Sequence, residues 1–566
     1  MLLIAISWIY ILFTTLNLGV VFDKIMGLKN QNFIITSILG LFSVTILSSI
    51  WAIFGRINIE FHIVFALLNI FLVSRFCDSI FVIYNSFLLE IKELTTFSKL
   101  FLILISALII AQCTTVPFVI DNESYYIQTI KWLNEYGFVK GLVNLHLFFG
   151  QTSGWHIVQS VYNFSFLYEN FNDLSGFCLL LGNIFAILKL NEYYKNSNKN
   201  FLLIGLFPLM NIFFFQFISA PSPDIPVYVF SFILFFYFLE NFEKTTLEKF
   251  NLMVVLVLFL LYIKNTTLTL VLVPIIILSY NFKFLKNKLS KSVVLSIIVL
   301  LLFVIKNMII CGAPIFPSRI DTLFTMDYSI PDSIQHFYYN EIKYFGFSVT
   351  ENQYENFSVA ALFFQWLTMP KLNGIFNKIS IILIFIVPFF IYKFHNKKSL
   401  WALYSIMAIQ LFLLLITSPQ YRFFMNFVLF FSLFCLLFFV QNKKMIQFLM
   451  LFSLLPVVIV LFVPINLTTF TNNKSMMENS NFSISNVIFP NKNTKNDTTF
   501  EVIQLGNLKY NSPVKNEFFW ANGNGELPCV NKQQIDYFRK YFHIIPQMRT
   551  NNLKDGFYAK KLSENE

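Results

Sequence analysis

Long runs of hydrophobic residues, separated by short polar segments, occupy the chain from Leu2 to about residue 464. An apolar run of roughly 17–25 residues is long enough to cross the ~30 Å hydrocarbon layer of a membrane as an α-helix. The pattern therefore predicts about fourteen transmembrane helices. Their expected ranges are 2–21, 33–54, 60–75, 99–118, 174–190, 201–218, 224–240, 250–263, 265–281, 292–310, 379–393, 400–416, 423–440 and 446–464.

Composition supports this interpretation. Hydrophobic residues make up 56% of the 566 residues and charged residues only 13%, against roughly 45–50% and 25% in soluble chains. This excludes soluble enzymes, nucleic-acid-binding proteins and disordered scaffolds. The six cysteines are scattered and show no CxxC motif, which argues against a disulfide or zinc framework. The first run lacks a basic flank and a cleavage site, so we interpret it as a retained helix.

Lysine and arginine residues between the runs predict the orientation of the chain. With the N-terminus outside, nineteen cations fall in cytoplasmic loops and only Arg56, Lys264 and Arg422 in the opposite short loops. This asymmetry is typical of multi-pass proteins, whose cytoplasmic loops are rich in these residues. It places residues 119–173, residues 311–378 and the tail from about 466, with both termini, outside the cytoplasm. The tail is expected to contain an Asn-rich linker (472–498), a strand at FEVIQL (500–505) and a small ordered domain.

The first outer loop carries two acids directly after a predicted membrane helix, Asp121 and Glu123. Apolar residues recur at helical spacing from Ser124 and again from Ser153, which predicts two amphipathic helices on the membrane surface. A carboxylate at this boundary can serve as a general base, with its pKa raised by partial burial. Alternatively, Asp121 caps the helix and Glu123 favours its dipole, which requires no chemistry.

The same loop contains further candidate side chains, each with two interpretations. His146 and His156 are candidates for ligand contact, although lone histidines are more often structural. The aromatic residues are candidates for stacking on sugar rings, or else form an interfacial belt. These aromatic residues are Tyr125, Tyr126, Trp132 and Trp155.

Other outer turns carry charges suited to a phosphorylated ligand. Arg422, in TSPQYR (417–422), opposes the orientation rule, and Asp224 lies at a helix start in SAPSPDIP (219–226). Lys264, Lys306 and Arg319 also lie near the outer boundary. Fixed cations at this depth would bind a lipid phosphate, and arginine binds it in a bidentate manner. Alternatively, these side chains extend to the interface without a ligand, and Asp224 is only a helix cap.

The middles of the apolar runs are almost free of charged residues. Ion-coupled transporters usually need such residues there, so the sequence favours interfacial chemistry over a permeation path.

The motifs together resemble a known superfamily. DNESYYIQTIKWLNEYGFVKGLVNLH, SAPSPDIP, GAPIFPS and SPQYRF are similar to blocks of a bacterial family of GT-C-type membrane glycosyltransferases, over residues 100–430 and weakly over WANGNGELPC and LKDGFY. Glu123 and Tyr126 depart from that pattern, in which related sequences often carry glycine and histidine. The resemblance implies a GT-C-like domain over 99–465, preceded by additional helices in 1–98 and followed by an outer C-terminal region, 466–566.

The resemblance further implies transfer of a sugar from a polyprenyl-phosphate donor to a glycan, lipid or protein acceptor of the cell envelope, at the outer face of a bacterial inner membrane. Asp121 would be the base, Glu123 the second acid, and Arg422 with its neighbouring cations the donor-phosphate site. Some members of the superfamily use a divalent metal such as Mg²⁺ or Mn²⁺, and this chain shows no ligand set beyond the acids. A polysaccharide polymerase or ligase acting on undecaprenyl-linked glycans, and a flippase or transporter of such glycans, remain alternatives.

Overall fold

The computed structural model describes the chain apart from residues 169–170, 319–325, 394–396, 441, 471–478, 480, 496–497, 516–517 and 564–566. Within the described residues, ten helices are long and apolar enough to cross a membrane, and each coincides with a predicted run. The protein is therefore an α-helical, multi-pass membrane protein. These helices are α1 (Leu2–Met26), α2 (Phe33–Phe54), α3 (Ile59–Lys92), α4 (Thr96–Cys113), α7 (Leu174–Asn196), α10 (Asp224–Asn241), α14 (Ser290–Cys311), α18 (Lys371–Lys393), α19 (Lys398–Ile416) and α21 (Lys443–Phe462).

The other four predicted runs do not form long single helices, so the expected total of fourteen is not confirmed. The first of them is broken at Gly205 and Pro208, and the third forms a bent pair with an angle of 88°, which gives up to eleven spans if it counts as one. Apolar composition alone does not reveal the first of these breaks, because proline removes a helical hydrogen bond without lowering hydrophobicity much. The elements within or next to these runs are α8 (Lys199–Gly205), η4 (Phe207–Met210), α9 (Asn211–Phe214) and η5 (Phe215–Phe217); α11 (Leu247–Ile263); η6 (Asn265–Val271) and α12 (Leu272–Tyr280), followed by α13 (Phe282–Leu285) and η7 (Lys286–Lys288); and α20 (Met425–Leu436).

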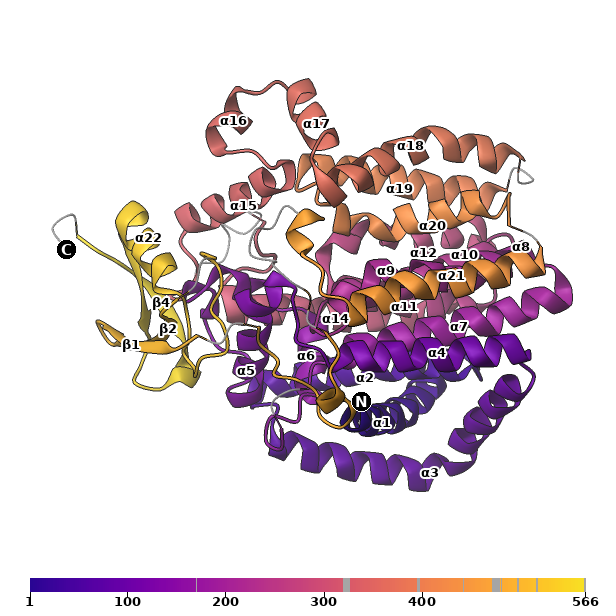
Figure 1. Cartoon of the computed structure of the whole chain (residues 1–566). Helices are drawn as coiled ribbons and strands as arrows, with labels where there is room; N and C mark the ends of the chain where they lie inside the picture. Colours follow the sequence, from indigo (N-terminus) through magenta and orange to yellow (C-terminus); the bar gives the residue numbers. More distant parts are fainter. Residues whose placement is uncertain are drawn as a thin grey trace.

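Close backbone contact joins α1 and α2. A Cβ atom on Gly40 would lie 1.7 Å from the Thr15 carbonyl oxygen, and one on Gly19 would lie 2.0 Å from that of Thr36. Small residues allow this approach between membrane helices, where packing replaces the hydrophobic effect. Helix α2 is consequently well buried, whereas α3, which bends at Phe76, lies along the outside of the bundle and is mostly open to lipid (Figure 1).

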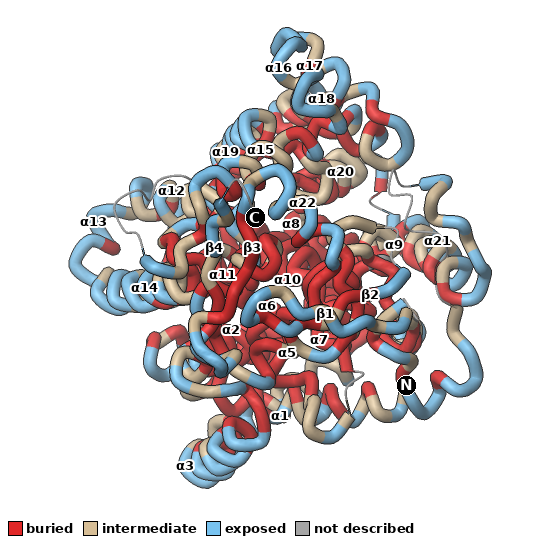
Figure 2. The backbone as a smooth tube through the Cα atoms, turned by 90° about the vertical axis from the view of Figure 1, so that its left-hand side faces the viewer, coloured by how far each residue is buried: buried red, intermediate tan, exposed pale blue. Residues whose placement is uncertain are grey.

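The first and second predicted outer segments and the tail gather at one end of the bundle, on the left in Figure 1. Viewed from that end, buried residues fill the centre and exposed residues the periphery (Figure 2). The elements between the long helices are η1 (Asn122–Tyr126, a π-helix), α5 (Ile127–Glu135), η2 (Leu142–Asn144), η3 (Leu147–Gln151), α6 (Gly154–Val161), α15 (Asp332–Phe347), α16 (Glu351–Asn356), α17 (Val359–Leu367) and η8 (Tyr421–Phe423).

Two of these elements correct a prediction. Helices α5 and α6 were expected on the membrane surface, but seven of the nine residues of α5 and all eight of α6 are buried. The cover over α5 comes from the C-terminal region, since the Gln128 amide donates to the carbonyls of Gly523 and Gly525. The amphipathic pattern identified the helices correctly, but their polar side chains are mostly buried against other parts of the protein.

The C-terminal region forms two antiparallel hairpins and one helix. Strand β1 spans Phe500–Leu505, which confirms the strand predicted at FEVIQL. The described part of the expected linker is not free, because the Asn491 N–H donates to the Thr114 carbonyl at 2.9 Å. The remaining elements are η9 (Leu467–Thr469), η10 (Ile484–Val487), β2 (Leu508–Pro513), α22 (Lys532–Phe542), β3 (Ile544–Met548), η11 (Leu553–Asp555) and β4 (Phe557–Lys561), with β1 paired to β2 and β3 to β4.

Candidate functional site

Asp121 lies where α4 has ended and the π-helix η1 begins. Its Oδ2 atom accepts a hydrogen bond from an Arg422 terminal nitrogen at 2.6 Å, and the Tyr126 hydroxyl approaches the same oxygen at 3.5 Å. The side chain of Asp121 is 14% exposed and that of Arg422 26%. The two sequence motifs that contain these residues, about 300 positions apart, therefore meet in one ion pair.

Arg422 is held in place by groups on both sides of it. It lies in η8, the short turn between α19 and α20, where its Nε donates to Gln420 Oε1 at 3.2 Å. Its own backbone carbonyl accepts a hydrogen bond from the Tyr228 hydroxyl at 3.0 Å. These contacts fix the direction of the guanidinium group, so Arg422 is a positioned cation rather than a freely moving surface side chain.

Asp224 and Lys264 complete the cluster. Asp224 begins α10 and Lys264 ends α11, and the Lys264 ammonium group forms an ion pair with Asp224 Oδ1. Asp224 Oδ2 lies 3.9 Å from Arg422, and the Lys264 Nζ lies 4.6 Å from the ring centre of Phe423. Four separate parts of the chain thus contribute two acids and two cations, which we call the charged cluster: Asp121, Asp224, Lys264 and Arg422.

Burial and charge act in opposite directions within the charged cluster. Burial lowers the pKa of Lys264, and the carboxylate of Asp224 opposes that shift. Burial also raises the pKa of the Tyr126 phenol, with the Asp121 charge adding to the effect, so Tyr126 keeps its proton and can donate to Asp121. The arrangement keeps a carboxylate and a guanidinium in contact at a partly open position, where an anionic ligand can compete for the guanidinium.

The described residues contain no preassembled metal site. Among them, no group of three or more His, Cys, Asp or Glu side chains is arranged to hold a metal ion. Asp121 and Asp224 are already paired with cations. The charged cluster therefore offers no complete set of protein ligands for the divalent metal that some members of the superfamily use.

Glu123 faces away from Asp121, into the C-terminal region. Its carboxylate accepts hydrogen bonds from the Lys495 backbone N–H and the Thr494 hydroxyl, each at 2.8 Å, and its backbone carbonyl accepts from Asn522 and Gly523. Burial raises the pKa of Glu123, and these hydrogen bonds partly oppose the shift. The family resemblance implies a catalytic role for both Asp121 and Glu123. In the structure, the contacts of Glu123 are instead suited to holding the tail.

Among the described residues, the remaining predicted cation is not in the charged cluster. Lys306 is buried and donates to the Thr152 carbonyl, in the loop that precedes α6. Arg319 lies outside the described residues. Of the described cations proposed for phosphate, the structure therefore brings Arg422 and Lys264 together and leaves Lys306 apart.

The predicted substrate-binding side chains are mostly buried in packing. His146 uses both ring nitrogens, with Nδ1 accepting from the Phe148 N–H at 3.0 Å and Nε2 lying 3.2 Å from the Trp520 carbonyl. Burial lowers the pKa of His146 to about 4 and that of His156 to about 3, so both are neutral at physiological pH. Trp132 and Trp155 are at most 1% exposed, too little to stack on a sugar.

Tyr125 is buried among Tyr126, Phe148 and His156, and it supports the wall of the charged cluster rather than an open surface. Two positioning residues, Gln420 and Tyr228, were missed in the sequence. Each had a signal in the sequence. Gln420 lies within the motif SPQYRF. Tyr228 follows Asp224 by four positions, which places Asp224 and Tyr228 on one face of a helix.

Comparisons with known proteins give one match. The family model described as Domain of unknown function (DUF8201) matches residues 1–429. No curated protein and no solved structure matches the chain. The matched range includes all four residues of the charged cluster and ends before the C-terminal region. Because it covers more than half of the sequence, the chain belongs to the DUF8201 family.

Proposed function

We propose that this protein is a membrane glycosyltransferase that moves a sugar from a polyprenyl-phosphate donor to a cell-envelope acceptor, with Asp121 as general base. The observation that carries the proposal is the contact between the Asp121 carboxylate and the Arg422 guanidinium at 2.6 Å. A candidate base and a candidate phosphate ligand thus lie side by side at one end of a helical bundle. The asymmetry of the loop cations supports placing that end at the outer face of the membrane.

The ion pair suggests how the donor binds. The donor phosphate is a diester with one negative charge, and it replaces Asp121 as the partner of Arg422. Lys264, held by Asp224, adds a second positive charge nearby. Displacement turns the Asp121 carboxylate away from its cation and leaves it free to accept a hydrogen bond from the acceptor hydroxyl.

The charge changes of the sugar-transfer step balance within the charged cluster. The acceptor oxygen attacks the anomeric carbon of the sugar, a new glycosidic bond forms, and the bond from that carbon to the phosphate oxygen breaks with its electron pair. The acceptor proton passes to Asp121. The leaving polyprenyl phosphate gains its second negative charge as Asp121 becomes neutral, so Arg422 and Lys264 stabilise the charge that develops in the transition state.

Proteoliposomes that contain the purified protein test the proposal. A polyprenyl-phosphate donor with a radiolabelled sugar is supplied with envelope glycan as acceptor, and label in glycan is measured separately from label that only crosses the bilayer. We expect incorporation by the wild-type protein and none by Asp121→Asn, with unchanged folding and insertion. Movement of donor without incorporation would reject the proposal in favour of a flippase, and wild-type transfer by Asp121→Asn would reject Asp121 as the base.

A further inference from the structure

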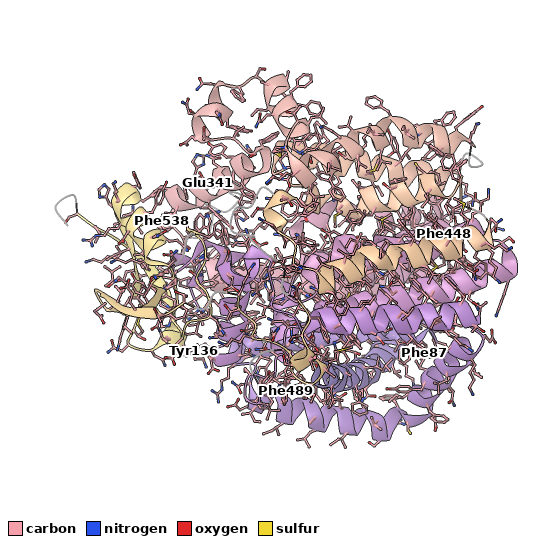
Figure 3. All side chains as sticks on the ribbon, in the orientation of Figure 1. Phe87, Tyr136, Glu341, Phe448, Phe489 and Phe538 are labelled. Atoms are coloured by element: carbon pink, nitrogen blue, oxygen red, sulfur yellow. The ribbon has the colours of Figure 1, made fainter. Side chains whose placement is uncertain are left out.

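A surface groove lies away from the charged cluster, where the N-terminal helices, α5 and the C-terminal region meet. Its volume is about 420 Å³, within the usual range for ligand sites. Figure 3 shows the labelled Tyr136 in this part of the molecule, below the C-terminal region. The lining consists of Trp51, Gly55, Arg56, Glu60, Glu135, Tyr136, Asn552 and Lys554.

Charges of both signs line this groove in equal number. Arg56 donates to both oxygens of Glu60, with the shortest contact at 2.6 Å, and its other terminal nitrogen lies 3.8 Å from Glu135. Lys554 reaches across from the C-terminal region, and its Nζ lies 3.4 Å from the Phe54 carbonyl. Two acids and two cations give a neutral lining that offers both positive and negative groups, which suits a ligand that carries both charges.

The rim of the groove is apolar and exposed. Phe54 is 76% exposed, Ile59 43% and Ile63 57%, at the end of α2 and the start of α3. Both helices are candidate membrane spans, so these side chains face lipid near one membrane boundary. Trp51 and Tyr136 also line the groove, and amphipathic aromatic rings are favoured at membrane interfaces.

We propose that this groove binds the headgroup of a zwitterionic phospholipid with a primary ammonium group, such as phosphatidylethanolamine. Its phosphate lies against Arg56 and Lys554, its ammonium group donates hydrogen bonds to Glu60 and Glu135, and its acyl chains follow Phe54 and α3. An anionic headgroup leaves both carboxylates facing a ligand without positive charge. A quaternary ammonium headgroup cannot donate the hydrogen bonds that carboxylates accept. The site is independent of the proposed catalytic function.

Native mass spectrometry of the purified full-length protein tests this site. The protein is mixed in detergent with equal amounts of phosphatidylethanolamine, phosphatidylcholine and phosphatidylglycerol that share the same acyl chains. We expect the wild-type protein to retain phosphatidylethanolamine preferentially. The double variant Glu60→Gln/Glu135→Gln should lose that preference by about tenfold, because each lost partner was a charge-assisted hydrogen bond.

A matched control removes an equally exposed ion pair at a distant place. Glu93 and Lys195 form such a pair at 2.6 Å, joining the ends of α3 and α7. Glu93→Gln/Lys195→Gln should retain the lipid as the wild-type protein does, and the thermal midpoint without lipid reports whether either variant is misfolded. Equal retention of the three lipids, a preference for phosphatidylglycerol, or an unchanged preference in a folded Glu60→Gln/Glu135→Gln protein would each overturn the proposal.

Discussion

Asp121 and Glu123 are two positions apart, yet they belong to different regions of the molecule. Asp121 is paired with Arg422 in a partly open cluster built from four parts of the bundle. Glu123 is 4% exposed, has no ion pair among the described residues, and is bound by backbone and hydroxyl donors of the tail. Residues at positions i and i+2 of a helix do not face each other, so one short segment supplies both regions.

The difference teaches what surroundings do to the same functional group. A carboxylate beside a guanidinium can exchange that partner for a phosphate and then take up a proton. A carboxylate enclosed by hydrogen-bond donors satisfies its lone pairs permanently and stabilises the contact between two segments. The first arrangement is suited to chemistry, and the second to docking of the C-terminal region.

The largest expected effect is a difference in the rate of sugar transfer between variants of Asp121 and variants of Glu123. Asp121→Asn should lower the rate of sugar transfer by about 10²–10⁴-fold, because a general base contributes that much. Glu123→Gln should stay close to the wild-type rate, since an amide oxygen still accepts from Lys495 and the amide nitrogen can donate to the Thr494 hydroxyl. The measurement is label incorporation in proteoliposomes. If both variants were equally impaired, the comparison would fail and Glu123 would share the catalytic role.

Affinity for the product, polyprenyl phosphate, should differ between variants of the two residues of the Asp121–Arg422 ion pair. Asp121→Asn should bind polyprenyl phosphate more tightly than the wild-type protein, because the ligand no longer displaces a carboxylate from Arg422. Arg422→Gln should weaken binding by about 10- to 100-fold through loss of hydrogen bonds to a charged group. Titration with the purified proteins in detergent measures both affinities, with Glu93→Gln as a control at the other end of the bundle. Weaker binding by Asp121→Asn would contradict competition between the carboxylate and the phosphate.

Loss of the Glu123 side chain should loosen the tail. Glu123→Ala removes the acceptors of the Lys495 N–H and the Thr494 hydroxyl, at a cost of about 1.5 kcal/mol, or roughly tenfold more opening of that contact. Limited trypsin digestion of the C-terminal region measures the opening, and Glu123→Gln serves as the conservative control. Unchanged protection in Glu123→Ala would show that other contacts, such as those of Asn522 and Asn491, are sufficient.

Much of the fold could be predicted because its signals are local. Ten long apolar helices and the strand at Phe500–Leu505 follow from runs of residues that need no distant partner. Arg422, Lys264 and Asp224 could be selected because charge at the outer ends of apolar runs is costly without a partner. Their meeting with Asp121 depends on long-range packing, which sequence spacing does not encode.

The remaining errors come from partners that lie far away in the sequence. Glu123, Lys131 and Gln128 bind the tail roughly 370–400 positions later, so their burial could not be read from their own segment. Lys306 and His146 contact backbone carbonyls. Every residue has such a carbonyl, so the sequence does not indicate which one is the partner. The same cause misplaced α5 and α6 on the membrane surface.

The smallest effect should be a pH dependence of stability that comes from Glu123. Its pKa is raised in the folded protein from the ordinary value of 4.5, chiefly by burial. The folded state therefore binds this proton more tightly than the unfolded state, and stability from this group is complete below about pH 4.5 and falls as pH rises to the folded pKa. Glu123→Gln lacks this proton, so its thermal midpoint should decline less than that of the wild-type protein over the same pH range. Identical profiles for the two proteins would mean that the hydrogen bonds from Lys495 and Thr494 fully offset burial, and that the tail holds Glu123 as a carboxylate at no cost.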